Sequence, residues 1–169
     1  VPEKYTLESF RSLFVDYGFL MPLWNTAWVC FVTVVFGILI NAMAGFAFAK
    51  IRFRTKTFWF TLVIVTMMIP FEAIAIPLYS LVYNLNLVNT RTALILPAIA
   101  NGTYIFLFKN SYEDTPHSLY ESAMLEGASK FMIFRRIYLP LSKPIMVSAG
   151  LLIFFYQWQS YMWPLLAAN

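Results

Sequence analysis

The sequence predicts an all-α integral membrane protein that crosses the bilayer about four times. Of its 169 residues, 60% are hydrophobic and 12% are charged, which is about half the charge of an average soluble domain. Residues 17–49, 92–108 and 144–169 contain no charged residue, and residues 57–90 contain only Glu72. A bilayer core about 30 Å thick needs about 20 apolar residues per helix. Each stretch is therefore a candidate span within one transmembrane domain, residues 1–169.

The residues ahead of the first span mix charged and apolar side chains. Leu7, Phe10, Leu13 and Phe14 recur at helical spacing within residues 1–22, which favours a short helix lying on the membrane interface. A linker to an upstream segment is the alternative. No signal-peptide pattern opens the chain.

The first span is expected at residues 24–49. Within it, Gly37, Asn41, Gly45 and Ala49 follow one another at intervals of four, so they share one face of a helix. A stripe of small residues lets helix backbones approach closely in lipid. We therefore expect this face to pack against another helix.

The second span is expected at residues 58–78. It contains Pro70 and Pro77, with Glu72 between them. Proline removes a helical hydrogen bond and clashes with the preceding turn. Two prolines seven residues apart therefore predict a break or kink near one membrane surface.

The third and fourth spans are expected at residues 92–108 and 145–166. The third holds Pro97, Asn101 and Gly102, which makes it polar for a helix that faces lipid. It is therefore expected to face protein or a water-filled path.

The distribution of basic residues predicts the orientation. The loops at residues 50–56 and 109–143 would lie on one side, and together they hold nine of the twelve Lys and Arg residues. Loops rich in Lys and Arg stay cytoplasmic, so Val1 and Asn169 are expected outside. The net charge of +4 is then a topology signal, and a nucleic-acid partner is not expected.

The long cytoplasmic loop at residues 109–143 predicts two short helices. Thr115 can cap the first one, because Pro116 suits the first helical position. Gly127 is expected to end that helix in a left-handed conformation. Ser129 can cap a second helix through Ile137, which Pro140 and Pro144 would end.

The same loop carries a spaced sequence pattern. In order, it reads Glu121-Ser122-Ala123, three residues, Gly127, nine residues, and then Ile137, Leu139 and Pro140. This pattern resembles the EAA loop in the membrane subunits of bacterial ABC importers. The sequence departs from the family at Ser122, where Ala is usual, and at Glu126, where sugar-type members usually have Asp.

Further blocks resemble the carbohydrate-uptake, maltose-system-like branch of these permeases. They are Asn25-Thr26, residues 47–50, 52–54, 67–70, 76–79 and 94–97, and Trp163-Pro164-Leu165. The resemblance implies a type I ABC-importer permease-like helical bundle with a cytoplasmic coupling-helix loop, in the bacterial cytoplasmic (inner) membrane. Family members usually have six spans, so further spans are expected before Val1 and after Asn169.

The resemblance also implies partners: two ATPase subunits, a second homologous permease, an external solute-binding protein and a sugar-like solute. The residues implied in ATPase coupling are Glu121, Ser122, Ala123, Glu126, Gly127, Ile137, Leu139 and Pro140. The six glycines include no GxxxxGK phosphate-binding loop. No cofactor is therefore expected in this chain, and ATP and Mg would bind the partner ATPase.

Polar and aromatic residues on several spans are candidates for the solute path, because amides bind sugar hydroxyls and aromatic rings pack on sugar C–H faces. They are Glu72, Asn101, Thr103, Tyr104, Gln157, Trp158, Gln159 and Tyr161. The alternative for each is helix–helix packing or the aromatic belt at the membrane interface. Trp163 is expected in that belt.

Other kinds of transporter are alternatives to a sugar importer. The first alternative is an ABC importer for a non-sugar solute, such as an amino acid, a peptide or a polyol phosphate. An ion-coupled secondary transporter would require buried acids or basic pairs in its spans, and only Glu72 is available. One histidine, His117, and one cysteine, Cys30, exclude a multi-histidine or thiolate metal site, and no catalytic residue is expected.

Overall fold

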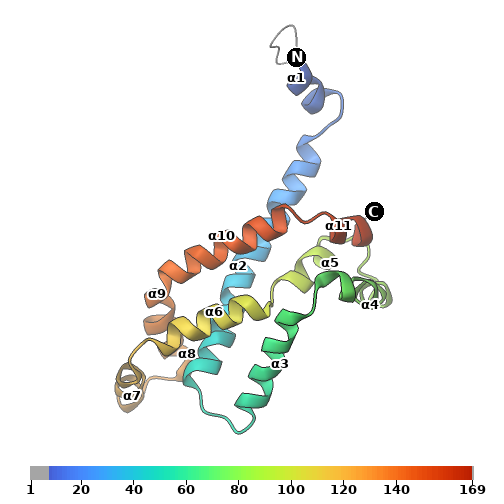
Figure 1. The fold of residues 1–169 in the computed structure, drawn as a ribbon. Coiled ribbons are helices and arrows are strands. Elements are labelled where there is room, and N and C mark those ends of the chain that lie inside the picture. Colours follow the sequence, from blue (N-terminus) through green and yellow to red (C-terminus); the bar gives the residue numbers. More distant parts are fainter. Residues whose placement is uncertain (1–7, 169) are drawn as a thin grey trace.

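The computed structural model describes residues 8–168, and within that range the chain is helical with no β-strand. Figure 1 shows a long helix, α2, around which shorter and sharply bent helices pack. The helix α1 (Glu8–Val15) precedes it, where a short interfacial helix is expected. Leu7, which belongs to that expected helix, lies outside the described residues.

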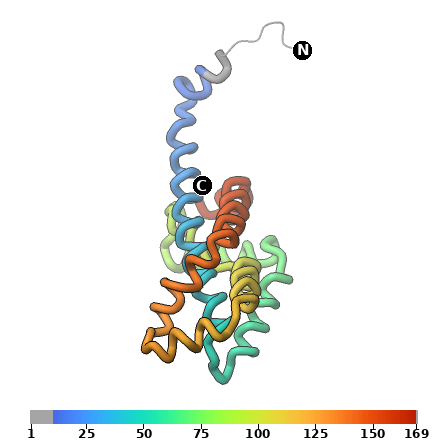
Figure 2. Tube along the Cα trace, turned by 90° about the vertical axis from the view of Figure 1, so that its left-hand side faces the viewer, coloured from blue at the N-terminus to red at the C-terminus, as the bar shows by residue number. Residues whose placement is uncertain are grey.

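The helix α2 spans Leu20–Lys50, with 31 residues. At 1.5 Å per residue it is about 46 Å long, so it exceeds a bilayer core. It contains the whole of the expected span at 24–49. Its first part projects beyond the other helices in both views (Figures 1 and 2), and Met21 and Trp24 there are exposed.

The expected second span is broken in two. The helix α3 (Lys56–Met68) ends just before Pro70, and α4 (Phe71–Asn84) leaves at an angle of 108°. Ile69 adopts an extended conformation (φ −87°, ψ 118°), as expected for a residue that precedes proline. Pro77, in contrast, lies inside α4 without ending it.

The expected third span is also discontinuous. The helix α5 (Arg91–Ile95) continues into the 3-10 turn η1 (Leu96–Ala98), and α6 (Gly102–Glu113) begins after a bend of 43°. The side chain of Asn101 caps α6, because its Oδ1 accepts a hydrogen bond from the Thr103 amide at 2.9 Å.

The remaining chain forms two corners and a final helix pair. In order, it consists of α7 (His117–Leu125), α8 (Lys130–Ile133), the π-helix η2 (Phe134–Tyr138), α9 (Leu139–Leu141), α10 (Lys143–Trp158) and α11 (Met162–Ala167). The helical run that starts at Lys130 continues past Ile137 and Pro140 and ends at Leu141, before Pro144. The Leu139 amide bonds the Phe134 carbonyl, five residues earlier, and this wider turn admits a proline without breaking the helix.

Within residues 8–168, α2 alone is long and apolar enough to cross a membrane as one helix. Three bent pairs of helices have the length and composition of a span if each pair is counted together. The four-span topology therefore stays a prediction.

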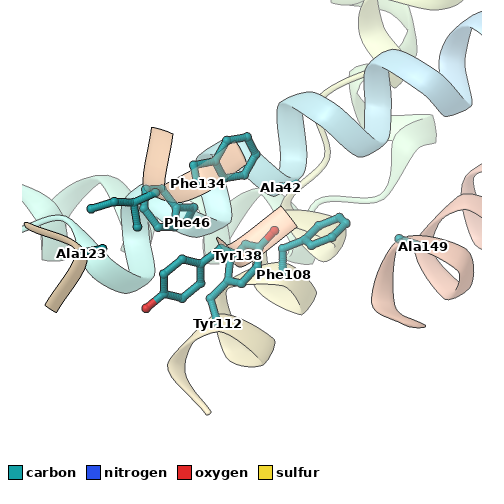
Figure 3. Packing of buried hydrophobic residues seen from close by; sticks show 9 residues of the cluster. Ala42, Phe46, Phe108, Tyr112, Ala123, Phe134, Tyr138 and Ala149 are labelled. Carbon is teal, nitrogen blue, oxygen red and sulfur yellow. The ribbon is translucent and has the colours of Figure 1, made fainter. Parts of the chain in front are cut away.

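The buried residues form two clusters. The larger cluster joins α2, α6, α7, α8, η2 and α10 through Phe46, Phe108, Tyr112, Tyr138 and their neighbours (Figure 3). The smaller cluster joins α4, α5 and α11 around Val82, Ala93, Trp163 and Ala167. Through Ala123, the larger cluster packs against α7, the helix that is predicted to contact another protein.

Candidate functional site

The C-terminal end of α2 is embedded in the segment that carries the coupling pattern. The Phe46 ring lies 5.0 Å from the ring of Tyr138, 5.4 Å from Phe134, 6.2 Å from Tyr112 and 6.3 Å from Tyr120, measured between centroids. Aromatic pairs at these distances stabilise a contact beyond the area that they bury. A single α2 side chain therefore contacts α6, α7 and η2.

The helix α7 is anchored on one face only. Ala123 is its one buried residue, and it packs in the larger cluster, with Tyr120 half-buried beside it. Leu125 is 90% exposed, and Leu119 and Met124 are also exposed. Leu125 therefore takes little part in the packing of this chain.

The eight residues predicted to act in ATPase coupling fall into two groups. Glu121, Ser122, Glu126, Gly127 and Pro140 are exposed. Ala123 is buried, and Ile137 and Leu139 are half-buried against the larger cluster. One spaced pattern thus supplies both an outward surface and the residues that fix it to the bundle. The Glu121 carboxylate lies 3.7 Å from the His117 ring, and both side chains face solvent.

The end of α7 has the geometry that its glycine predicts. Gly127 has a φ of +81°, its amide bonds the Met124 carbonyl at 3.0 Å, and the Ala128 amide bonds the Ala123 carbonyl at 3.0 Å. These two bonds define a Schellman motif. Ser129 caps α8 as expected, accepting a bond from the Met132 amide at 3.2 Å.

The start of α7 differs from expectation. Pro116 is in an extended conformation and stands outside the helix, which begins at His117 with no side-chain cap. The Thr115 hydroxyl is turned away, toward the Ser111 carbonyl at 3.4 Å.

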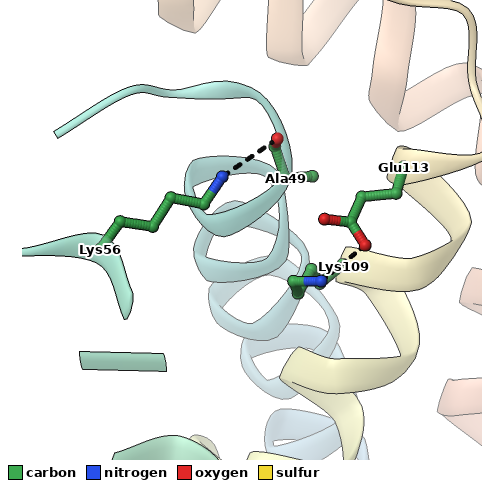
Figure 4. A network of polar contacts seen from close by, with 4 residues as sticks. All are labelled: Ala49, Lys56, Lys109 and Glu113. Carbon is green, nitrogen blue, oxygen red and sulfur yellow. Dashed lines mark hydrogen bonds and ion pairs between the residues drawn. The ribbon is translucent and has the colours of Figure 1, made fainter. Parts of the chain in front are cut away.

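The cationic turn after α2 and the helix α7 lie at the same end of the molecule. Lys50 Nζ donates to the Thr115 carbonyl at 2.7 Å, and Figures 1 and 2 show both segments at the lower end. Nearby, Lys56 donates to the Ala49 carbonyl at 3.4 Å and Lys109 pairs with Glu113 at 2.6 Å (Figure 4). The arrangement agrees with placing both basic loops on one side of the membrane.

Tyr138 lies at the centre of this end of the molecule. Burial raises the pKa of its phenol, and the neighbouring Tyr120 adds to the rise. The hydroxyl is buried without a hydrogen-bond partner among the described residues. The ring therefore acts as a neutral packing surface between α2 and η2.

The path candidates are not gathered in one cavity. Glu72 is exposed in the first turn of α4, Asn101 and Thr103 are exposed at the start of α6, and Tyr104 is half-buried. On α10, Gln157 is buried and Trp158 stacks on Phe154 at 5.4 Å. Gln159 and Tyr161 are exposed in the break that follows.

An open groove of about 380 Å³ lies between the end of α2, α3 and the start of α6. Its lining includes Phe48, Trp59, Thr66 and Asn101, and none of the other seven path candidates. The path residues therefore stay a prediction.

Asn41 is a polar residue within the stripe of small residues on the first span. It is fully buried, and its Nδ2 donates to the carbonyls of Gly37 at 2.6 Å and Ile99 at 3.0 Å. Its Oδ1 accepts from the Asn101 amide at 3.0 Å. A lone amide inside an apolar span is costly without hydrogen-bond partners. The presence of Asn41 in the apolar first span could therefore have identified it as a residue that bonds another helix.

Trp163 is not part of an exposed aromatic belt. It is buried between α4 and α5, and its Nε1 donates to the Ala93 carbonyl at 2.9 Å. The break at residues 159–161 turns α11 back onto α4 and α5, and this fold places the indole inside the smaller cluster.

The chain matches a family of known proteins. Residues 33–169 match the family described as "Binding-protein-dependent transport system inner membrane component". The chain belongs to this family. The family is described as an inner-membrane component, and the apolar helices of this chain agree with that location.

Several relatives of this permease-family chain have named transport systems. It is 37% identical over 166 residues to the arabinooligosaccharides transport system permease protein AraQ of Halalkalibacterium halodurans, covering 97% of this chain and 59% of the relative. It is 35% identical over 147 residues to the sn-glycerol-3-phosphate transport system permease protein UgpE of Brucella abortus, covering 87% and 52%. It is 30% identical over 159 residues to the lactose transport system permease protein LacG of Rhizobium radiobacter, covering 94% and 58%.

A solved structure shares the fold. It is the crystal structure of a bacterial ABC transporter involved in the import of the acidic polysaccharide alginate, matched with a TM-score of 0.79 at 26% identity over 86% of this chain and 51% of the other. The chain thus spans between half and three-fifths of the length of the proteins it matches.

Proposed function

We propose that this chain belongs to the permease subunit of an ATP-driven importer that moves a sugar or sugar-like solute across the inner membrane. An external solute-binding protein would deliver the solute. Two ATPase subunits and a second, homologous permease would complete the transporter. The chain itself would hydrolyse nothing, and ATP and Mg would bind the ATPase subunits.

One observation carries the proposal: α7 presents an exposed face at the end of the molecule that holds the basic turn after α2, and it is attached to the bundle by its opposite face. Leu125 is 90% exposed beside the carboxylates of Glu121 and Glu126. An apolar side chain surrounded by charge is typical of a protein contact. ATP-driven closure of the ATPase pair would push on this face and rock the helices between inward-open and outward-open states.

The relatives support a carbohydrate-like solute. Two of the named systems carry arabinooligosaccharides and lactose, and both solutes combine hydroxyl groups with apolar C–H faces. The glycerol-3-phosphate systems favour a polyol phosphate as the second candidate. A thermal-shift screen of the cognate solute-binding protein against oligosaccharides, glycerol-3-phosphate and amino acids decides between them. Stabilisation by an amino acid alone would overturn the sugar assignment.

The α7 contact is tested with Leu125→Ser in the full-length permease, co-expressed with its partner subunits. Truncating a central interface side chain costs about 1–2 kcal/mol, so the variant is expected to bind the ATPase about 5- to 30-fold more weakly and to co-purify with less of it. The control is Leu141→Ser, another exposed leucine, on α9. Full retention of the ATPase by Leu125→Ser would refute α7 as the contact.

A further inference from the structure

Lys50 differs from the other cations in its run. It is the last residue of α2 and is 6% exposed, whereas Arg52 and Arg54 are exposed. Exposed cations on a cytoplasmic loop need no role beyond topology. A buried ammonium group loses its hydration and is stable only with good hydrogen-bond partners, so its partners identify what it does.

The partner of Lys50 is a backbone carbonyl. Its Nζ donates to the Thr115 carbonyl oxygen at 2.7 Å, 65 residues away in sequence, and lies 5.6 Å from the centroid of the Tyr138 ring. Among the described residues, no carboxylate lies within 4 Å of this Nζ, and the carboxylate of Glu113, which attracts it from farther away, is paired with Lys109. The ammonium group therefore makes its hydrogen bond to one point on the chain.

That point is the corner between α6 and α7. Thr115 follows α6 and precedes Pro116, which stands outside α7. The corner has no continuous helix to transmit force, because α7 starts anew at His117. The bond from Lys50 thus ties the corner to the last turn of α2.

The other attachments of α7 differ in kind. Ala123 and Tyr120 pack against apolar residues, and apolar contacts are non-directional, so they resist separation better than sliding. A hydrogen bond from a charged donor is stronger and fixes direction as well as distance. Lys50 therefore supplies the directional constraint at the start of α7.

We propose that Lys50 is a positioning residue for energy coupling: it joins the α6–α7 corner to α2, so that α2 follows each displacement of α7. The inference rests on the proposed contact of α7 with an ATPase. It adds a named route, from α7 through the Thr115 carbonyl into the longest helix of the chain.

The test uses the full-length permease with its partner subunits in proteoliposomes. Lys50→Met keeps the length of the side chain and removes the donor, and Lys50→Arg restores a cationic donor. The matched control is Lys56→Met, which removes the same charge nearby, together with a bond from Nζ at the start of α3 to the Ala49 carbonyl of α2 that does not involve the α6–α7 corner. The measurements are ATPase co-purification, melting temperature and solute taken up per ATP hydrolysed.

Lys50→Met is expected to bind the ATPase normally and to lower the uptake per ATP by about tenfold, a loss of the order expected for a charged hydrogen bond. Lys50→Arg is expected to recover most of the wild-type uptake per ATP, and Lys56→Met is expected to keep it. If Lys50 only stabilised the fold, Lys50→Met would lower the melting temperature, and the complexes that remain folded would keep the wild-type uptake per ATP. A wild-type ratio in Lys50→Met overturns the proposal.

A second measurement does not depend on changing Lys50. Spin labels on exposed Met43 of α2 and Ser118 of α7, in a Cys30→Ser background, report the distance between the two helices. A constant distance in the nucleotide-free and ATP-bound transporter is expected if the two move together. A change of several ångströms would overturn the proposal, whereas loss of the α7 contact itself is reported separately by Leu125→Ser.

Discussion

Replacing Gly45 by alanine tests a close backbone contact between α2 and α6. A Cβ atom at Gly45 would lie 2.6 Å from the Phe108 Cβ and 2.9 Å from the Lys109 backbone nitrogen. Both atoms belong to α6 at or next to its backbone, so no side-chain rotation relieves the overlap. The two helices would have to separate.

The separation follows from the distances. Ordinary van der Waals contact begins at 3.4 Å, so α6 must withdraw by about 1 Å, since packed interiors have little free volume. Overpacking of this size costs about 1–3 kcal/mol. Gly150 is the matched control, because the atom nearest to its added Cβ is the Ile38 Cδ1 at 3.1 Å, the end of a flexible side chain. Alanine gains up to about 1 kcal/mol of helix propensity at either position, so the difference between the two variants reports the overlap.

Thermal unfolding of the detergent-solubilised protein measures the difference. The thiol of Cys30 is buried in α2, so a thiol-reactive dye reports the loss of helix packing. Gly45→Ala is expected to melt several degrees lower, at about 2–4 °C per kcal/mol, while Gly150→Ala melts at or above the parent temperature. Equal melting temperatures for the two variants would refute the argument from close backbone contact.

Three further changes test single contacts. Gly127→Val is expected to strain the αL turn by about 1–2 kcal/mol and to lower solute-stimulated ATPase activity, whereas Gly127→Asn tolerates this conformation and keeps most of it; equal activities would contradict a conformational role. Asn41→Leu leaves the Ile99 carbonyl without its donor and should lower the melting temperature by several degrees, as an unpaired buried group costs about 1–3 kcal/mol. An unchanged melting temperature would contradict a stabilising role for the Asn41 hydrogen bonds. Trp163→Phe removes the donor to the Ala93 carbonyl and should speed proteolysis near α11, and an unchanged rate would show that packing alone holds that helix.

Local features of this chain could be predicted from its sequence. The end of α7 depends on Gly127, whose left-handed φ of +81° needs no distant partner. The cap of α8 depends on Ser129, which bonds an amide three residues away. Pro70 breaks its span because of its own ring and its effect on the preceding residue. In each case the cause and its consequence lie within one helical turn.

Contacts between distant residues could not be predicted in the same way. Nothing near Trp163 in the sequence indicates that its indole would reach the Ala93 carbonyl, 70 residues away. Lys50 reads as one more cation in a basic loop until the Thr115 carbonyl is placed beside it. The path candidates depend on the same kind of information, because they must converge from three separate helices.

The break before α6 shows how the two kinds of information combine. Pro97 and Gly102 weaken the helix over residues 92–108, but they do not decide where it opens. The opening lies at residues 99–101, where the Ile99 carbonyl and the Asn101 amide lose their helical partners and bond Asn41 instead. A backbone without helical bonds is tolerated at membrane depth only where protein or a water-filled cavity satisfies it. Asn41 on α2 thus fixes the discontinuity that the sequence of the third span only permits, through the two hydrogen bonds that join α2 to the residues before α6.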